Sequence, residues 1–221
     1  MSKAYVLLSG GIDSSTALAL AQEKHGSVVA ISVHYGQRHN NELMYAKNIA
    51  NRFSVPHLII DLQSAIGVGG LTDQNLDIPD KTYAELPQGV SPTYVPNRNM
   101  LLLSMLVSKA VADPEAEVVY YGAHAEDSKN DAYPDCSAAF VNHMRRAIHV
   151  ATYTKIRLEV PFLHMTKAEV VTEGERLGVP WALTWSCYKG GIEHCGACPT
   201  CYARIEAFKI AGVDDPTVYA S

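Results

Sequence analysis

The chain has 221 residues, of which 48% are hydrophobic, and its 18 lysines and arginines against 23 acidic residues give a net charge of −5. Because the basic residues are scattered, the composition argues against a stable nucleic-acid interface, which usually needs a basic stripe. The apolar runs are shorter than the roughly 18 residues that a membrane-spanning helix requires, and the chain opens on a strand rather than on a secretory signal. We therefore expect a cytoplasmic globular protein with no membrane partner.

Apolar stretches alternate with amphipathic stretches along most of the chain. Such alternation predicts an α/β fold, a Rossmann-like open parallel sheet flanked by helices. The length suits one domain with an appendage, so we assign residues 1–180 to the domain and residues 181–221 to a C-terminal segment packed on it. Strands are expected at residues 4–8, 28–33, 57–60, 117–121 and 156–160, and helices at residues 13–25, 41–53, 100–111, 137–152, 166–177 and 202–211.

The first expected strand runs into a pair of glycines and then into a helix that begins at Asp13. A strand, a glycine turn and a helix N-terminus together bind anions, because backbone N–H groups point inward and the helix dipole adds positive potential. An ordinary glycine-rich turn is the alternative. No Gly-Lys pair occurs, so this is not a Walker phosphate loop. We predict that nucleotide phosphates bind at Leu8, Ser9, Gly10, Gly11, Ile12, Asp13, Ser14, Ser15, Thr16, Ala17 and Leu18.

Polar residues follow the second expected strand, which ends at Val33. Ligands of open parallel sheets lie beyond the carboxyl ends of the strands, so these residues should lie beside the glycine turn. Gln37 and Arg38 are therefore candidate substrate contacts. A solvated loop is the alternative for Arg38 and His39.

Residues 62–96 lack a helical period and carry many glycines and prolines. A loop of this length usually forms a lid or a binding segment. It leads to Arg98 at the start of the next expected helix, where Asn97 or Asn99 is expected to be the cap. A guanidinium there suits bidentate capture of a carboxylate or phosphate, and a local capping or salt-bridge role is the alternative.

The fourth expected strand opens into a polar run at residues 122–136. Polar residues at the carboxyl end of a strand are costly in a core and typical of a site. Asp127 and Asp135 are candidates to bind N–H groups of a substrate or a Mg²⁺ ion held with the phosphates, and each is equally typical of a turn or cap. Cys136 is either a nucleophile or, as we favour, a half-buried thiol at a helix start.

Thr166 and Glu169 form a capping-box pattern at the start of the helix expected at residues 166–177. Lys167 lies in the first turn of this helix, where the dipole disfavours a cation unless an anion faces it. Lys167 is therefore a candidate pyrophosphate partner, with simple exposure to solvent as the alternative.

Four of the five cysteines gather near the end of the chain, at Cys187, Cys195, Cys198 and Cys201. Two-residue gaps between thiols bend a loop around one ion, and four thiolates complete a tetrahedral set. Zinc fits this set best, and because no position stays open the site should be structural. An iron–sulfur cluster is the chemical rival, and His194 is an alternative ligand.

The glycine turn Ser9-Gly10-Gly11-Ile12-Asp13-Ser14 resembles the PP-loop of the N-type ATP pyrophosphatases. Together with the four cysteines and several shorter motifs, it makes nearly the whole chain resemble the 7-cyano-7-deazaguanine synthase family of the queuosine pathway. The shorter motifs are Tyr35-Gly36-Gln37-Arg38-His39, Val95-Pro96-Asn97-Arg98-Asn99, Tyr133-Pro134-Asp135-Cys136 and Ser186-Cys187-Tyr188.

The resemblance implies an adenine nucleotide alpha hydrolase-like fold and a ligase that uses ATP with Mg²⁺. Its substrates would be 7-carboxy-7-deazaguanine and ammonia, which become 7-cyano-7-deazaguanine through an adenylated carboxylate and an amide. With the positions argued above, we expect the catalytic residues to be Asp13, Arg98 and Lys167. The rivals are another PP-loop amidating or tRNA-modifying enzyme and a non-catalytic zinc-ribbon binding module. A homodimer stays open as an alternative to a monomer.

Overall fold

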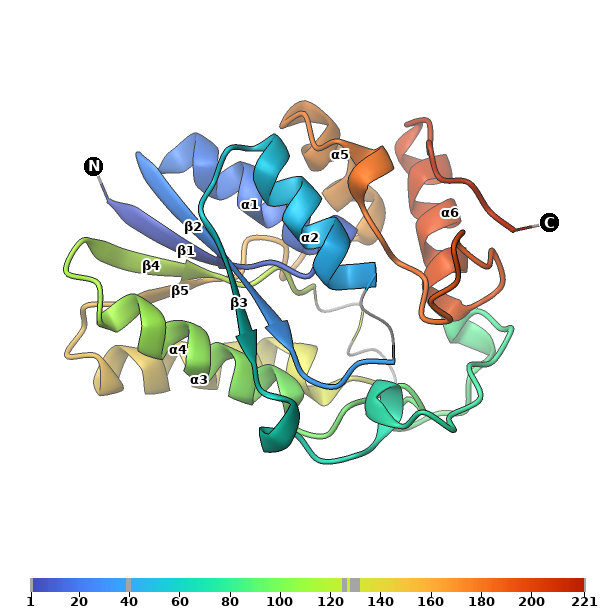
Figure 1. The fold of residues 1–221 in the computed structure, drawn as a ribbon, viewed down its shortest axis with the longest axis horizontal. Helices are drawn as coiled ribbons and strands as arrows, with labels where there is room; N and C mark the ends of the chain where they lie inside the picture. The colour runs from blue at the N-terminus through green and yellow to red at the C-terminus, as the bar shows by residue number, and fades with distance from the viewer. Residues whose placement is uncertain (1, 39–40, 125–126, 128–131, 221) are drawn as a thin grey trace.

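A five-stranded parallel sheet forms the centre of the computed structural model, which describes residues 2–38, 41–124, 127 and 132–220 (Figure 1). Its strand order is β3-β2-β1-β4-β5, and every neighbouring pair is parallel. This arrangement confirms the predicted α/β class. The strands are β1 (Lys3–Leu7), β2 (Ser27–His34), β3 (His57–Asp61), β4 (Ala116–Tyr120) and β5 (Arg157–Glu159).

Helices cover both faces of the sheet (Figure 1). One face carries α3 and α4, and the other carries α1, α2 and α5, with α6 packed beside α5. None of the helices in the described part of the chain combines the length and hydrophobicity that a bilayer crossing requires. The helices are α1 (Ile12–Lys24), α2 (Asn41–Arg52), α3 (Arg98–Val111), α4 (Ala138–Ala151), α5 (Lys167–Arg176) and α6 (Pro199–Ala211).

The central strand β1 is apolar along its length because it supplies both cores. Ala4 and Val6 point into the cluster under α1, α2 and α5, whereas Tyr5 and Leu7 point into the cluster under α3 and α4. Successive strand side chains alternate between faces, so a strand covered on both sides reads as an unbroken apolar run.

The direction of the chain across the sheet changes between β1 and β4. From β1 the chain moves outward through β2 to β3, and it then returns to place β4 on the other side of β1. Such a switch point leaves a crevice beyond the carboxyl ends of the two strands. The turn after β1 and the residue after β4 meet there, because a Cβ at Gly122 would lie only 2.7 Å from the carbonyl oxygen of Asp13.

Residues 62–96 contain no strand or α-helix, as predicted. The only regular structure in this stretch is three short 3₁₀ turns at Gln63–Ala65, Gly70–Thr72 and Tyr83–Glu85. The segment runs from the end of β3 to the start of α3 and forms much of the outer wall beyond the sheet (Figure 1).

The expected asparagine cap of α3 is wrong in its mechanism. Asn97 occupies the cap position in the left-handed conformation, with φ 56°, and its side chain makes no capping hydrogen bond. Instead Asp135, which is distant in sequence, accepts the Asn99 N–H at 3.3 Å. The capping box of α5 is confirmed: Thr166 Oγ1 accepts the Glu169 N–H at 3.2 Å, and Glu169 accepts the Thr166 N–H at 2.7 Å.

Helix α5 packs closely on α1 through Gly174, where an added Cβ would lie 2.3 Å from the Trp181 ring and 2.8 Å from Thr16 Oγ1. We expect Gly174→Ala to lower the free energy of unfolding by about 1–3 kcal/mol, because overpacking forces neighbours apart. Urea unfolding measures this change. Gly67→Ala is the control, since its methyl group would meet nothing within 4 Å. Equal stabilities of the two variants would contradict the close packing.

Candidate functional site

A cavity of about 230 Å³ opens at the switch point, beyond the carboxyl ends of β1, β2 and β4. The glycine turn, the residues after β2, the start of α3, the start of α5 and the C-terminal segment all contribute to its walls. This is the sheet edge where the sequence predicted the site. The lining includes Ser9, Gly11, Asp13, Ser14, Tyr35, Gln37, Arg98, Asn99, Asp127, Lys167, Trp185 and Ser186.

The glycine turn has a shape that only glycine permits at position 10. Gly10 has φ +82°, and a Cβ there would lie 2.7 Å from the backbone nitrogen of Ala46 in α2. Ser14 Oγ accepts the Ser9 N–H at 3.1 Å and lies 3.3 Å from the Gly11 carbonyl oxygen, which closes the turn. Ser9 is exposed and Gly11 is half-buried, so the turn faces the cavity, and none of the described side chains fills it.

Asp13 and Lys167 form an ion pair beside this turn. Lys167 Nζ lies 3.3 Å from Asp13 Oδ2, which places an anion in front of a lysine in the first turn of α5, as the helix dipole requires. The other carboxylate oxygen of Asp13 is buried and has no hydrogen-bond partner in the described structure. The pair therefore joins the start of α1 to the start of α5 at one wall of the cavity.

Arg98 lies at the mouth of α3 and lines the cavity. Its Nε donates to Asn99 Oδ1 at 3.1 Å, its Nη1 donates to the Tyr35 hydroxyl at 3.2 Å, and the guanidinium stacks over the Tyr35 ring at 5.3 Å. Burial raises the pKa of Tyr35 to about 12, so this hydroxyl stays neutral. Burial also raises the pKa of Glu42, against the opposing effect of Arg98. Arg98 is the cation of this wall.

Of the two substrate contacts predicted after β2, Gln37 lies at the cavity and Arg38 does not. Gln37 lines the cavity, but its side chain closes a backbone turn: its Oε1 accepts the Tyr35 N–H at 2.8 Å and its Nε2 donates to the Val33 carbonyl at 3.3 Å. Arg38 does not line the cavity, and its Nη1 donates to the Leu76 carbonyl in the long loop. His39 lies outside the described residues.

The two predicted aspartates differ in exposure to the cavity. Asp127 lines it, and one of its oxygens lies 3.5 Å from Nε2 of the buried His124. Asp135 is buried and holds the start of α3, while its second oxygen has no hydrogen-bond partner among the described residues. Burial raises the pKa of Asp135, with Arg98 acting in the opposite direction.

The predicted polar run after β4 falls partly outside the described structure, at residues 125–126 and 128–131. Cys136 at its end is buried and lines the cavity. Burial raises the pKa of this thiol well above its usual range, and the Tyr121 hydroxyl lies 3.8 Å from its sulfur. Because the thiolate is the nucleophilic form, Cys136 is poorly suited to attack a substrate.

Several cavity residues escaped the sequence reasoning, and Trp185 is the most consequential. Its backbone N–H donates to the Gly10 carbonyl at 2.8 Å, which fastens the C-terminal segment to the glycine turn. Thr200 Oγ1 donates to the Ser186 carbonyl at 2.6 Å, and both residues line the cavity. Their positions next to the cysteines could have indicated that they lie near the site. Other residues of the two cavities for which the sequence predicted no role are Glu42, Tyr121, His124 and Tyr188.

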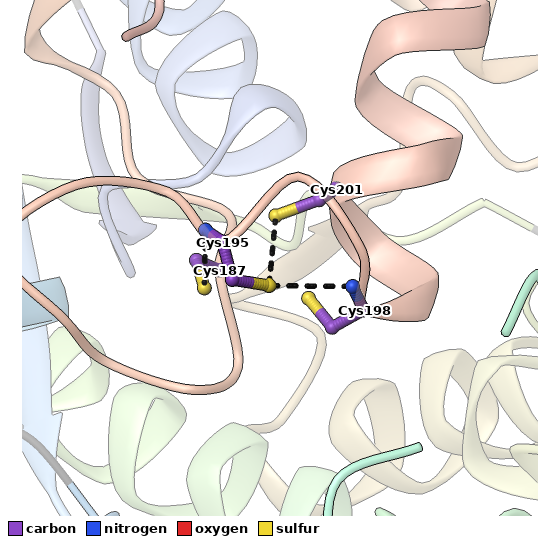
Figure 2. A group of neighbouring side chains, drawn as sticks. All are labelled: Cys187, Cys195, Cys198 and Cys201. Carbon is purple, nitrogen blue, oxygen red and sulfur yellow. Dashed lines mark hydrogen bonds between the residues drawn. The ribbon is translucent and has the colours of Figure 1, made fainter. Parts of the chain in front are cut away.

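Four cysteine side chains converge where the C-terminal segment enters α6, as Figure 2 shows. The sulfurs of Cys187, Cys195, Cys198 and Cys201 all lie within 4.8 Å of one another. The sulfurs of Cys195 and Cys201 are 3.9 Å apart. A tetrahedral ion with metal–sulfur bonds of about 2.3 Å would hold sulfurs roughly 3.8 Å apart. The spacing therefore fits a single ion.

The charge of the four sulfurs also fits a bound cation. Thiolates within 4.8 Å of one another repel, and a positive ion between them offsets this repulsion. Backbone N–H groups of Cys195 and Cys198 point at the sulfurs of Cys187 and Cys195, at 3.4 and 3.3 Å.

His194 does not belong to this group of ligands. Its Nε2 accepts the Ser186 N–H at 3.1 Å, and its ring packs on that of Trp185 with centroids 4.2 Å apart. Burial lowers the pKa of His194 to about 4, so the ring is neutral near pH 7. The alternative in which His194 replaces a cysteine is wrong, because the residue supports the Trp185–Ser186 wall.

A buried arginine connects α6 to the last residues of the chain. Arg204 has no exposed surface, and it pairs with Asp215 at 3.0 Å. Its Nη1 also donates to Thr184 Oγ1 at 2.8 Å, and the Tyr219 hydroxyl donates to Asp215 at 2.6 Å. The pair therefore joins α6 both to the segment before Trp185 and to the stretch that follows α6.

The parallel sheet, the glycine turn at its switch point and the facing cations define a protein of the PP-loop class. A family model described as "Queuosine biosynthesis protein QueC" matches residues 3–212. The chain belongs to the QueC family.

Similar proteins cover almost the whole chain. A 7-cyano-7-deazaguanine synthase of Caldicellulosiruptor bescii is 42% identical over 98% of this chain and 97% of its own length. One from Pseudoalteromonas atlantica is 43% identical over 98% of each chain. Among solved structures, the U34-tRNA thiolase NcsA of Methanococcus maripaludis with its [4Fe-4S] cluster is similar in fold, with a TM-score of 0.50 and 15% identity. That match covers 95% of this chain and 65% of the thiolase.

We expect Cys198→Ser to lower both the bound metal and the thermal stability, since a structural ion contributes its binding energy to folding. Elemental analysis measures the metal content, and calorimetry measures the midpoint of thermal unfolding. Cys136→Ser is the matched control, because this cysteine is not part of the four-sulfur group. An unchanged metal content in Cys198→Ser would contradict the assignment of the site.

Proposed function

We propose that this chain is an ATP-dependent ligase that converts 7-carboxy-7-deazaguanine and ammonia to 7-cyano-7-deazaguanine. The observation that carries the proposal is the open glycine turn at the switch point, with Lys167 and Arg98 on the walls beside it. Full-length similarity to proteins named 7-cyano-7-deazaguanine synthase supports the choice of substrate.

In the proposed first step, the substrate carboxylate attacks the α-phosphorus of ATP and pyrophosphate leaves. Backbone N–H groups between Gly10 and Ser14 and the dipole of α1 hold the leaving phosphates. Lys167 balances the charge that develops on them, and Asp13 keeps the lysine in position. Arg98 orients the carboxylate or the α-phosphate. The nucleotide occupies the predicted stretch from Leu8 to Leu18.

The second step joins nitrogen to the activated acid. The lone pair of ammonia forms a C–N bond, the C–O bond to AMP breaks, and a proton leaves the nitrogen. The product amide is then activated in the same way: its oxygen attacks a second ATP, pyrophosphate leaves, and loss of AMP with two N–H protons gives the nitrile. We assign recognition of the flat ring to Gln37, Arg98 and Asp127, which line the cavity. Arg38 and Asp135 were also predicted as substrate contacts, but they do not line it: Arg38 bonds to the long loop and Asp135 holds the start of α3.

Zinc is the ion that we assign to Cys187, Cys195, Cys198 and Cys201. The 3.9 Å separation of two sulfurs supports a single ion, because a cluster of several irons would hold its ligands farther apart. The ion would stabilise residues 181–221 as a unit on residues 1–180, and with it the Trp185–Ser186 wall. Mg²⁺ would accompany ATP and share the phosphate charge.

We place the reaction in the cytoplasm. The enzyme acts on small-molecule substrates and does not bind nucleic acid stably. The net charge of −5 supports the last point. We propose a homodimer as the assembly to be tested by light scattering.

We expect Asp13→Ala to reduce turnover at least about 100-fold, because the lysine that balances the phosphate charge loses its partner. Pyrophosphate release from ATP in the presence of 7-carboxy-7-deazaguanine and ammonium measures the effect. The metal content should equal that of the wild type, since the cysteines lie on other elements. Activity near that of the wild type would remove this pair from the mechanism.

A thiolating activity would need a reactive cysteine, and the buried thiol of Cys136 is the one outside the metal group. We expect Cys136→Ser to keep turnover within about threefold of the wild type, because a hydroxyl can replace its contacts with Asn99 and Tyr121. Mass spectrometry of the nitrile product measures the rate. Loss of more than about 100-fold would favour covalent catalysis by Cys136 instead.

A further inference from the structure

A second cavity meets the first one at its inner end. It lies between the 3₁₀ turn at Tyr83–Glu85, the start of α5 and helix α6. The two cavities share three lining residues, Tyr83, Asp127 and Lys167. Its outer walls are mostly apolar, from Ala84, Leu86, Ala203 and Ile210 among others. A small molecule can therefore reach the residues beside the glycine turn through the second cavity.

A buried histidine stands at the inner end of this second cavity. His124 is 2% exposed, and neither of its ring nitrogens has a hydrogen-bond partner in the described part of the chain. Unpaired buried polar groups are costly, so such a histidine points to a ligand. Its Nε2 lies 3.5 Å from Asp127 Oδ1 and 3.8 Å from Asp13 Oδ2.

We propose that the second cavity admits ammonia and that His124, Asp127 and Asp13 bind it beside the glycine turn. This inference rests on the proposed function, and it names where the nitrogen enters. Ammonia has three N–H donors, which match one imidazole nitrogen and two carboxylates, so its lone pair stays free to attack. Lys167 already pairs with Asp13, so its positive charge offsets one of the two carboxylate charges around the bound ammonia.

The arrangement also accounts for the proton that is released when the amide forms. When the lone pair forms the C–N bond and the C–O bond to AMP breaks, its electron pair leaves with AMP. The nitrogen then carries one proton too many. His124 Nε2 or the Asp127 carboxylate accepts this proton and passes it to water in the second cavity.

Steady-state kinetics test the proposal by comparing a reaction that consumes ammonia with one that starts from the amide. Initial rates are measured against ammonium chloride with saturating acid and ATP, for the wild type, His124→Phe and Ala203→Phe, which narrows the second cavity. The same proteins then receive the preformed amide and ATP, a reaction that uses no ammonia and reports general damage to the site. His149→Phe on exposed α4 and Ile205→Phe on α6, outside both cavity walls, are the matched controls.

We expect the KM for ammonium to rise roughly tenfold in His124→Phe, which loses about one hydrogen bond to ammonia. The KM should also rise in Ala203→Phe, because the bulkier ring narrows the second cavity. The amide reaction should show no matching change in either variant. A KM within twofold of the wild type in both variants overturns the proposal, and so does an equal loss in both reactions. Should His124→Phe not fold, Ala203→Phe decides. A wild-type protein that converts neither substrate overturns the proposed function itself.

Discussion

Three backbones meet at the glycine turn, and the absence of two side chains makes this possible. Gly10 lets the turn touch the backbone of α2, and Gly122 lets the end of β4 touch the backbone of Asp13. With a Cβ at either position these elements would separate, and the N–H groups of the turn would no longer face a closed crevice. The placement of every cation and carboxylate around the cavity depends on this contact.

The C-terminal segment completes the site rather than standing apart from it. Trp185 is bonded to the turn through Gly10, and its ring packs on His194 next to the cysteines. Residues of this segment belong to both hydrophobic clusters of the sheet, with Cys198 in one and Phe208 in the other. The segment that carries the four cysteines thus forms one wall of a site whose floor is the strand–turn–helix unit of β1 and α1.

Local signals gave the sheet, the helices, the turn and the four sulfurs, because hydrophobic period, glycine pairs and cysteine spacing are short-range patterns. Contacts between distant segments were not accessible in the same way. Asp135 caps α3 in place of Asn97, and His124, which follows β4, lies 3.8 Å from Asp13 at the start of α1. Arg38 matched a motif, yet its side chain turns toward the long loop. The roles given to individual site residues stay predictions.

The buried pair of Arg204 and Asp215 has a consequence for the ends of the molecule. The carboxylate of Asp215 belongs to an irregular stretch after α6. A truncation designed for crystallisation could remove this stretch, because it contains no helix. Cutting the chain before that residue would strand a guanidinium in an apolar interior, at a cost of several kcal/mol. The loss of this ion pair would also weaken the contact of Arg204 with Thr184, next to the Trp185 that is bonded to the glycine turn.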